Sequence, residues 1–273
     1  MNLILSLFPG IGLLDMAFES EGFTVVRGPD YLWGGDVRKF HPPDDRFDGV
    51  IGGPPCQAFS ALSEIVRARG YEPKFGNLIP EFERCVLEAA PGWWLMENVP
   101  RAPIPFALPY EGQPVKTRVR MGEYRIHTFL LNNRQCFAEN GEPAIQHRER
   151  RFTFGLRGRM AHLQIETAAL HNIDFEYAAT GAGKRTVPIA IGGSGKPKRN
   201  RVGRLVERDI LSHGSQRSAK GFAAVKDLQG LPADFDIPPF TVAAKVQAVA
   251  NGVPLPMGRA IARAIRNATS QPR

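Results

Sequence analysis

The sequence predicts an α/β fold built around a mostly parallel sheet. Three observations lead to this prediction. Short apolar runs alternate with helical patterns in the first half of the chain, as they do in βαβ units. A glycine-containing turn follows the first apolar run. The periodic pattern weakens from about Gly158, so the 273 residues are expected to form one large domain with a small appendage.

The expected elements follow the chain in order. Buried strands are predicted by apolar runs at Leu3–Phe8, Thr24–Arg27, Asp48–Gly52 and Trp93–Glu97, and two further strands at Tyr124–Leu131 and Arg151–Leu156. Helical spacing predicts helices over about Leu13–Ser20, Leu78–Ala90, Phe222–Leu228 and Thr241–Ala268, the last interrupted at Asn251–Pro256. Residues 179–220 are rich in Gly, Ser and basic side chains, which predicts loops or a small irregular subdomain.

The net charge of +8 favours a polyanionic partner. Ten Lys and Arg lie between Lys184 and Lys220, against only Glu207 and Asp209. This stretch is either a solvated basic face or a nucleic-acid contact. No apolar run reaches the roughly 18 residues of a membrane span, and no signal-peptide pattern opens the chain. We therefore expect a cytoplasmic protein that does not bind membranes.

The three cysteines, Cys56, Cys85 and Cys136, show no CxxC spacing, and the six histidines form no ligand pattern. We expect neither a metal site nor a disulfide framework. Cys85 lies inside a helical apolar pattern, and Cys136 lies in no motif. Both fit buried, inert thiols.

The turn Phe8-Pro9-Gly10-Ile11-Gly12 closes the first strand and opens the first helix. Glycines there let a ligand approach a helix N-terminus, either a dinucleotide or the carboxylate end of S-adenosylmethionine, although a tight turn without a ligand fits equally well. Asp30, eighteen residues beyond Gly12, could accept hydrogen bonds from ribose hydroxyls, and Asp36 from an adenine amino group. Both carboxylates could instead cap turns or face solvent.

Gly52–Ser60, with the sequence GGPPCQAFS, is the most informative stretch. It puts Cys56 just beyond a buried strand, on a loop stiffened by two prolines. Ligands gather at the carboxyl ends of strands in open α/β sheets. A thiol there could act as a nucleophile if neighbouring groups lower its pKa. A buried inert cysteine is the alternative interpretation.

Two later motifs carry charged side chains at strand ends. Glu97, in Met96–Pro100 (MENVP), ends an apolar strand, so partial desolvation should raise its pKa and let it carry a proton near neutral pH. Arg148 and Arg150, in QHRER, are two residues apart and would point to one side of an extended segment. They could hold a phosphate, a base or a carboxylate, or lie on a solvated strand edge.

In this order, the motifs resemble those of the DNA cytosine-5 methyltransferase family. FPGIG is similar to its FxGxG motif, PCQ to its nucleophile loop, MENVP to its Glu-Asn-Val motif and QHRER to its QxRxR motif. Leu228–Pro232 resembles its LQGFP element, and Ala250–Pro254 its GNAVP element. The six motifs span Phe8 to Pro254, which is most of the chain.

The resemblance implies a Rossmann-like S-adenosylmethionine-dependent methyltransferase fold with a mixed, mostly parallel sheet. Residues 1–157 and 221–273 would form the catalytic domain, and residues 158–220 a small, irregular target-recognition region. The implied enzyme is a monomer, with S-adenosylmethionine as cofactor and double-stranded DNA as partner. The resemblance also implies the cofactor-binding positions, which are Phe8, Gly10, Ile11, Gly12, Asp30, Tyr31, Asp36, Pro54, Leu78, Asn251 and Val253.

The implied catalytic residues are Cys56, Glu97, Arg148 and Arg150. Cys56 would attack C6 of a cytosine flipped out of the duplex, because stacked DNA hides C5 and C6. Glu97 would hold N3 and the exocyclic amine, and the two arginines would position the base and the carboxylate. The resemblance also assigns a supporting role to Asn98, which would hold the loop of Glu97.

The sequence departs from the family pattern at four places. Pro9 replaces a small serine, and Gly252 stands where Ala or Ser is usual. The interval from Asp30 to Asp36 is short, which predicts that a helix there is reduced to a turn. The recognition region has only about 60 residues, so sequence readout is expected to be short, with much of the binding electrostatic.

The sequence fits other functions less well. An RNA-modifying member of the family would carry Cys-Phe-Thr, which does not occur here. A DNA-binding regulator without catalysis would not need the charged motifs. A nicotinamide-dependent oxidoreductase explains only the glycine turn and Asp30. A modified cofactor, the recognition sequence and membership of a restriction-modification system stay open.

Overall fold

The computed structural model describes residues 2–55, 76–106, 123–158, 162–169, 175–179, 186–190 and 219–270. The chain divides into two compact units. The first consists of Met1–Gly10, Phe18–Leu131 and Glu149–Gln164, and the second of Ile11–Ala17, Asn132–Arg148 and Ile165–Arg273. The predicted division into a catalytic domain and a recognition region remains a prediction.

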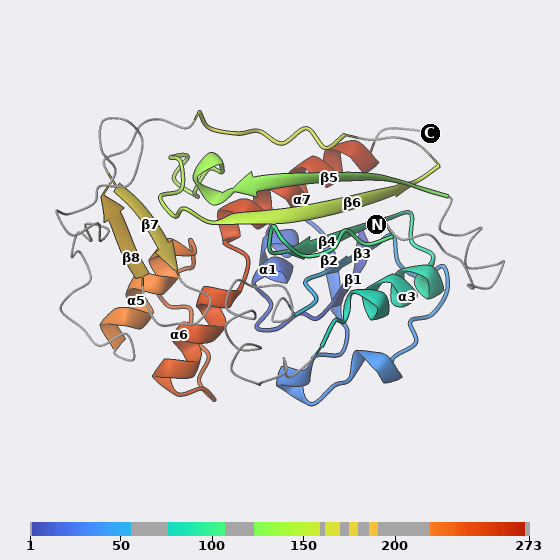
Figure 1. The fold of residues 1–273 in the computed structure, drawn as a ribbon, viewed down its shortest axis with the longest axis horizontal. Helices are drawn as coiled ribbons and strands as arrows, with labels where there is room; N and C mark the ends of the chain where they lie inside the picture. Colours follow the sequence, from blue (N-terminus) through green and yellow to red (C-terminus); the bar gives the residue numbers. More distant parts are fainter. Residues whose placement is uncertain are drawn as a thin grey trace. The chain divides into compact units, whose positions relative to one another are not determined.

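Unit 1 is organised around a six-stranded sheet with the strand order β2-β1-β3-β4-β6-β5 (Figure 1). Strands β1 to β4 pair in parallel, whereas β6 is antiparallel to β4. The sheet is therefore mixed and mostly parallel, as predicted. Its strands are β1 (Leu3–Leu7), β2 (Thr24–Arg27), β3 (Gly49–Gly52), β4 (Trp93–Asn98), β5 (Tyr124–Asn132) and β6 (Glu149–Arg157).

The register of this sheet brings three chain segments to one edge. Leu7 at the end of β1 lies opposite Gly52 at the end of β3, and Gly52 lies opposite Met96 of β4. Phe8 and Gly53, which follow β1 and β3, therefore leave the sheet beside Glu97 of β4. This is the edge at which open α/β sheets bind ligands.

Two tryptophans of β4 fill the core on both faces of the sheet, because successive side chains of a strand point to opposite sides. Trp93 and Trp94 are almost completely buried. The neighbouring strands carry glycine where the indoles lie. A Cβ added to Gly49 of β3 would come within 2.3 Å of Trp93, and one added to Gly155 of β6 within 2.2 Å of Trp94. The glycines thus make the close approach of the strands possible.

The helices and short turns connect these strands or build unit 2. A second small sheet is the antiparallel pair β7 (Phe175–Ala179) and β8 (Thr186–Ala190). The helices are α1 (Leu13–Ser20), α3 (Ile79–Ala89), α5 (Ala219–Leu228), α6 (Val242–Asn251) and α7 (Leu255–Thr269). The 3-10 turns are η1 (Tyr31–Trp33), η2 (Val37–Lys39) and η4 (Asn133–Gln135).

Unit 2 has a core formed by one face of α1 and the C-terminal helices. Leu13 and Ala17 pack in one cluster with α5, α6 and the start of α7. A Cβ on Gly252 would come within 2.5 Å of Leu13, and one on Gly258 would come equally close to Ala17. Small residues therefore let α7 and the turn before it approach α1 closely.

The predicted strands and helices of the first half match the structure to within one or two residues at each end. In the Gly- and Ser-rich stretch, which was predicted to form loops or a small irregular subdomain, β8 occupies Thr186–Ala190. The sequence of this strand, Thr-Val-Pro-Ile-Ala, contains a proline, which has no backbone N–H to donate. Both strands of a two-stranded sheet are edge strands, where a proline is tolerated. Among the described residues, no helix combines the length and the hydropathy that crossing a membrane requires.

Candidate functional site

The turn after β1 has an unusual backbone. Phe8 has φ of 55° and Gly10 has φ of 57°, both in the left-handed region. A bulky residue rarely adopts this conformation, and such strain collects at functional sites. A Cβ on Gly10 would meet no atom within 4 Å, so the backbone there is bare on one side. The turn thus leaves room for a ligand beside its backbone.

Asp30 ties the segment after β2 to this turn. Its carboxylate accepts hydrogen bonds from the backbone N–H of Gly10 at 2.9 Å and of Leu32 at 2.7 Å. The indole Nε1 of Trp33 donates to the Gly10 carbonyl oxygen at 2.7 Å. Asp30 therefore caps η1 and at the same time holds the glycine turn in place. Trp33, which is 57% exposed, was not predicted from the sequence.

Asp36 begins the second short turn, as the short interval after Asp30 predicted. Its side chain accepts a hydrogen bond from the backbone N–H of Arg38 and caps η2. The Arg38 guanidinium donates to both carboxylate oxygens and to the Tyr31 hydroxyl. The hydrogen bond from Arg38 lowers the pKa of Asp36 to about 2. Arg38 is a second member of this site that the sequence analysis did not identify.

Glu97 and Arg150 form an ion pair at the carboxyl end of β4. The Arg150 Nε lies 2.9 Å from Glu97 Oε1, and their side chains are only 16% and 14% exposed. They come from paired strands, since Glu97 of β4 lies opposite Phe152 of β6. The structure therefore brings together two of the residues predicted from separate motifs. The predicted rise in the pKa of Glu97 stays a prediction.

The loop after β3 is held against the same strand end. A Cβ on Gly53 would lie 3.1 Å from Glu97 Oε2. The side-chain amide of buried Asn98 donates to the Pro54 carbonyl oxygen at 3.1 Å and so supports this loop. Cys56 follows two residues later and lies outside the described residues, as does the rest of the segment up to residue 75.

The remaining predicted residue of unit 1, Leu78, lies at the N-terminus of α3. It is 4% exposed and packs in the core cluster with Val37 of η2. The side chain of Asn77 accepts a hydrogen bond from Ile79 N at 3.0 Å, which helps to start the helix. Leu78 thus connects α3 with the turn that carries Asp36.

In unit 2, Arg148 is 4% exposed, and its Nη2 donates to the Gly252 carbonyl oxygen at 3.0 Å. Gln146 donates to the Leu228 carbonyl oxygen and to the Gln229 side chain, which in turn donates to Val249 and Gly252. These bonds join three of the sequence motifs. Four predicted residues of the unit differ in exposure: Asn251 is exposed, Ile11 is partly buried, and Val253 and Gly12 are buried.

The other two cysteines are buried, as predicted, and burial raises the pKa of each thiol to about 12. Neither Cys85 nor Cys136 is therefore a nucleophile at neutral pH. Within the described residues, no group of three or more His, Cys, Asp or Glu side chains could hold a metal ion.

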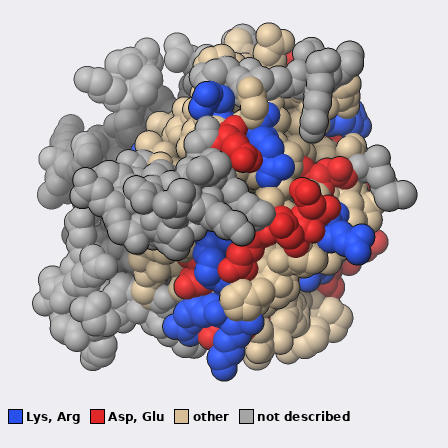
Figure 2. Space-filling view, turned by 90° about the vertical axis from the view of Figure 1, so that its right-hand side faces the viewer, with Lys and Arg blue, Asp and Glu red and all other residues tan. Residues whose placement is uncertain are grey.

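Figure 2 shows a face of the molecule on which basic and acidic side chains are interspersed. It is not the surface expected to bind a polyanion. Most of the predicted basic stretch, Lys184–Lys220, lies outside the described residues, which include only 186–190 and 219–220 of it. Its contact with a nucleic acid remains a prediction.

Comparison with known proteins gives consistent similarities. A family model for C-5 cytosine-specific DNA methylases matches residues 34–179. Type II methyltransferase M.NgoPII of Neisseria gonorrhoeae is 34% identical over 114 residues, which cover 35% of this chain and 33% of that protein. M.AquIA of Picosynechococcus is 30% identical over 188 residues, covering 56% of this chain and 71% of the relative. The chain thus spans about a third of the length of M.NgoPII.

Solved structures share the fold. A DNA modification methyltransferase encoded within an E. coli prophage matches with a TM-score of 0.58 and 16% identity, covering 99% of this chain and 100% of its own. A mutant of Spodoptera frugiperda DNMT2 matches with a TM-score of 0.51 and 13% identity, covering 97% and 99%. At these identities, the two structures support the fold alone.

Proposed function

The chain belongs to the C-5 cytosine-specific DNA methylase family, and from this premise we propose that it is a DNA cytosine-5 methyltransferase. It would transfer the methyl group of S-adenosylmethionine to C5 of a cytosine in double-stranded DNA. The observation that carries the proposal is the ion pair of Glu97 and Arg150, which lies against Gly53 at the start of the loop with Cys56. A carboxylate, a guanidinium and the start of the loop that leads to Cys56 thus lie at one strand end.

In this proposal, the thiolate of Cys56 adds to C6 of a cytosine flipped out of the duplex. Glu97 supplies a proton to N3 as the ring accepts the electron pair, so negative charge does not build up on the base. The resulting enamine is nucleophilic at C5. Once C5 carries the new methyl group, solvent takes up the C5 proton, the double bond is restored as the Cys56 thiolate is expelled, and the N3 proton returns to Glu97.

Arg150 would hold the Glu97 carboxylate in one orientation. Its Nε contact at 2.9 Å and the low exposure of both side chains support this role, because a buried guanidinium fork restricts the position of the carboxylate. Asn98 acts from the other side by holding the Pro54 carbonyl oxygen. Arg148, which donates to Gly252, would instead stabilise the turn that carries Asn251 and Val253.

The glycine turn after β1 and the Asp30 carboxylate beside it are suited to an adenosine cofactor. Gly10 leaves room beside its backbone, and each carboxylate oxygen of Asp30 accepts one backbone hydrogen bond and retains a second lone pair for a ribose hydroxyl. Tyr31 and Asp36 lie in the next two turns, where they could contact the adenine. S-adenosylmethionine, when bound, would supply an electrophilic methyl group. Phe8, Gly12, Ile11, Leu78, Pro54, Asn251 and Val253 are the other proposed contacts.

A product assay tests the proposal. Purified protein is incubated with S-adenosylmethionine and unmethylated duplex DNA, and the digested nucleosides are analysed by mass spectrometry, with Cys56→Ser in parallel. We expect 5-methyldeoxycytidine from the wild type only, and cofactor binding by both proteins. Methylated cytosine in a parallel incubation with RNA, and none in DNA, would make the substrate RNA. Equal loss of activity and of cofactor binding in Cys56→Ser would contradict the role of Cys56.

A further inference from the structure

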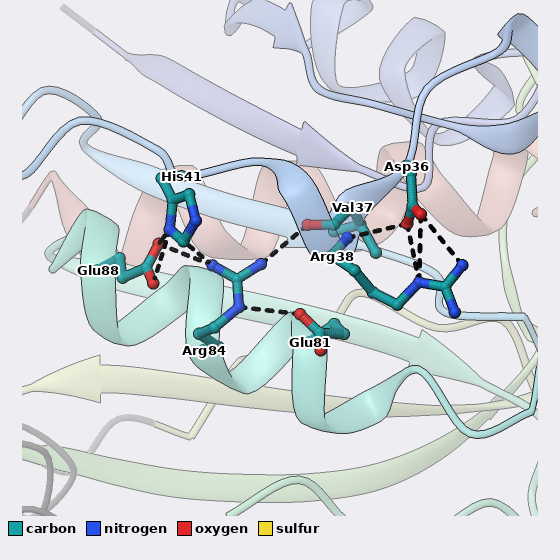
Figure 3. Close-up of polar contacts among 7 residues, drawn as sticks. All are labelled: Asp36, Val37, Arg38, His41, Glu81, Arg84 and Glu88. Atoms are coloured by element: carbon teal, nitrogen blue, oxygen red, sulfur yellow. Dashed lines mark hydrogen bonds and ion pairs between the residues drawn. The ribbon is translucent and has the colours of Figure 1, made fainter.

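Arg84 of α3 donates hydrogen bonds to three oxygen acceptors that orient its guanidinium, and its Nη1 also lies 3.3 Å from His41 Nδ1 (Figure 3). It donates to Glu81 Oε2 at 2.9 Å and to Glu88 Oε2 at 2.8 Å, both on the same helix. Its third contact leaves the helix, as Nη2 donates to the Val37 carbonyl oxygen at 2.8 Å. A planar guanidinium can serve three acceptors in fixed directions, which a lysine ammonium on a flexible chain cannot.

The two acidic neighbours determine how the Arg84 fork is held. Burial alone would lower the pKa of Arg84, but the hydrogen bonds to Glu88 and Glu81 outweigh it and the pKa is raised. The imidazole of His41 adds a further contact, with Nδ1 at 3.1 Å from Glu88 Oε2. The three side chains Glu81, Arg84 and Glu88 are each about a third exposed or less. The guanidinium is therefore charged and held in place before any ligand binds.

The acceptor Val37 belongs to the turn that carries Asp36. Asp36 is the N-cap of η2, and Val37 is its first residue. The Val37 side chain is 2% exposed and packs in the core cluster that contains Leu78, the residue directly before α3. Arg84 thus fastens α3 to a turn of only three residues, whose Arg38 contacts Asp36 within the turn and Tyr31 of η1.

We infer that Arg84 is a positioning residue for the adenosine pocket. It fixes the turn that carries Asp36 relative to α3 and to Leu78, the proposed cofactor contact directly before α3. The inference rests on the proposed function, in which Asp36 accepts a hydrogen bond from the adenine amino group. Arg84 touches no ligand in this role. Removing Arg84 should let the turn that carries Asp36 shift. The resulting loss of affinity should be largest for ligands whose binding depends on the adenine amino group.

The test compares two arginines that both anchor α3. Arg157 is a matched control, since it is also about a third exposed and donates to the Ala90 carbonyl oxygen at the C-terminus of α3 and to the Tyr124 hydroxyl. Affinities of wild type, Arg84→Met and Arg157→Met are measured by calorimetry for S-adenosylhomocysteine and for its hypoxanthine counterpart, which lacks the amino group. Unfolding in urea is followed for each variant.

We expect Arg84→Met to weaken binding of S-adenosylhomocysteine by about tenfold, the equivalent of one charge-assisted hydrogen bond. The preference for adenine over hypoxanthine should fall with it, and Arg84→Lys should restore only part of both. Arg157→Met should keep the wild-type affinity and preference, even if it unfolds at lower urea. The inference would be overturned if Arg84→Met kept the wild-type preference for adenine over hypoxanthine. It would also be overturned if Arg84→Met and Arg157→Met weakened ligand binding equally.

The outcomes separate the two proposals. If the wild type binds neither ligand, the proposed function fails. If the wild type binds S-adenosylhomocysteine without preferring adenine, the role of Asp36 fails and the positioning role with it. If the wild type binds with a preference that Arg84→Met retains, the proposed function stands and Arg84 is only a structural residue.

Discussion

Gly53 shows how little space separates Glu97 from the start of the loop that leads to Cys56. A Cβ at this position would approach Glu97 Oε2 to 3.1 Å. Such a distance forces one group to move by a few tenths of an ångström. Small displacements of catalytic groups reduce rates strongly, because the reacting atoms lose their alignment.

At this scale, Gly53→Ala should therefore lower kcat by about tenfold while the protein remains folded. Gly92→Ala is the matched control, since its Cβ would come within 3.3 Å of the Asp48 carbonyl oxygen, a similarly tight contact away from Glu97. Steady-state kinetics and urea unfolding of both variants measure the effect. If the two variants lose activity equally, crowding at Glu97 is not the cause.

The pKa of Asp36 gives a second residue-scale prediction. The pKa of the Asp36 carboxyl is lowered from 3.8 to about 2, and the largest cause is the hydrogen bond from Arg38. The charged contact is therefore complete above pH 3.8 and is lost only as the pH falls through about 2. In Arg38→Met, the carboxyl should titrate closer to 3.8. Carboxyl carbon NMR shifts between pH 6 and pH 3 should change for Asp36 in the variant and stay nearly constant in the wild type.

Several site residues could be predicted one by one from the sequence. Asp30 follows an apolar run, Glu97 ends one and Arg150 precedes one, so their positions at strand ends could be predicted from the motifs. Trp33 and Arg38 could not be predicted in the same way. Trp33 contacts a carbonyl oxygen 23 residues earlier, and Arg38 contacts a tyrosine seven residues earlier. Both contacts depend on how the turns fold back on the glycine turn.

At the scale of elements, β4 depends on space left by its neighbours. Gly155 of β6 faces Trp94, whose ring also contacts Phe82 and Phe106. Gly155→Ala should destabilise the fold by about 1 to 3 kcal/mol, the usual cost of overpacking a core. The free energy of unfolding from urea titration measures this loss.

A double variant assigns that cost to the indole. Trp94→Phe removes the atoms that the new Cβ would meet, so it should cost less in the Gly155→Ala background than in the wild type. If the two substitutions add without coupling, the destabilisation of Gly155→Ala arises elsewhere in β6.

Strands and helices were predictable where the apolar pattern was long and regular, as in α1, β2 and β4. The limit of this approach is visible at β7 and β8. Their residues show little alternation, and Gly-, Ser- and Lys-rich segments flank them, so local composition favoured loops. Pairing of β7 with β8 is a non-local interaction, which a pattern in one segment does not record. The polar links from Gln146 and Gln229 to the last helices were likewise beyond the sequence analysis.

At the scale of the whole molecule, the charge of +8 should dominate DNA binding. Replacing Lys198, Arg199 and Arg201 by Gln should reduce the slope of log affinity against log salt by about three, one per lost phosphate contact. Fluorescence anisotropy with duplex DNA between low and moderate salt measures this slope. The control replaces the exposed Arg46, Arg125 and Arg263 by Gln. If both triple variants reduced the salt slope equally, only the net charge of the protein would matter for DNA binding.

The covalent intermediate provides the most direct test of the account. A DNA duplex with 5-fluorocytosine at target positions cannot lose a proton from C5, so the enzyme should remain attached to it. With S-adenosylmethionine present, we expect the wild type to form a stable protein–DNA complex whose modified peptide contains Cys56, and Cys56→Ser to form none. An adduct on another residue, or methylation of ordinary duplex DNA without any adduct, would contradict the assignment of Cys56 and with it the mechanism built around Glu97 and Arg150.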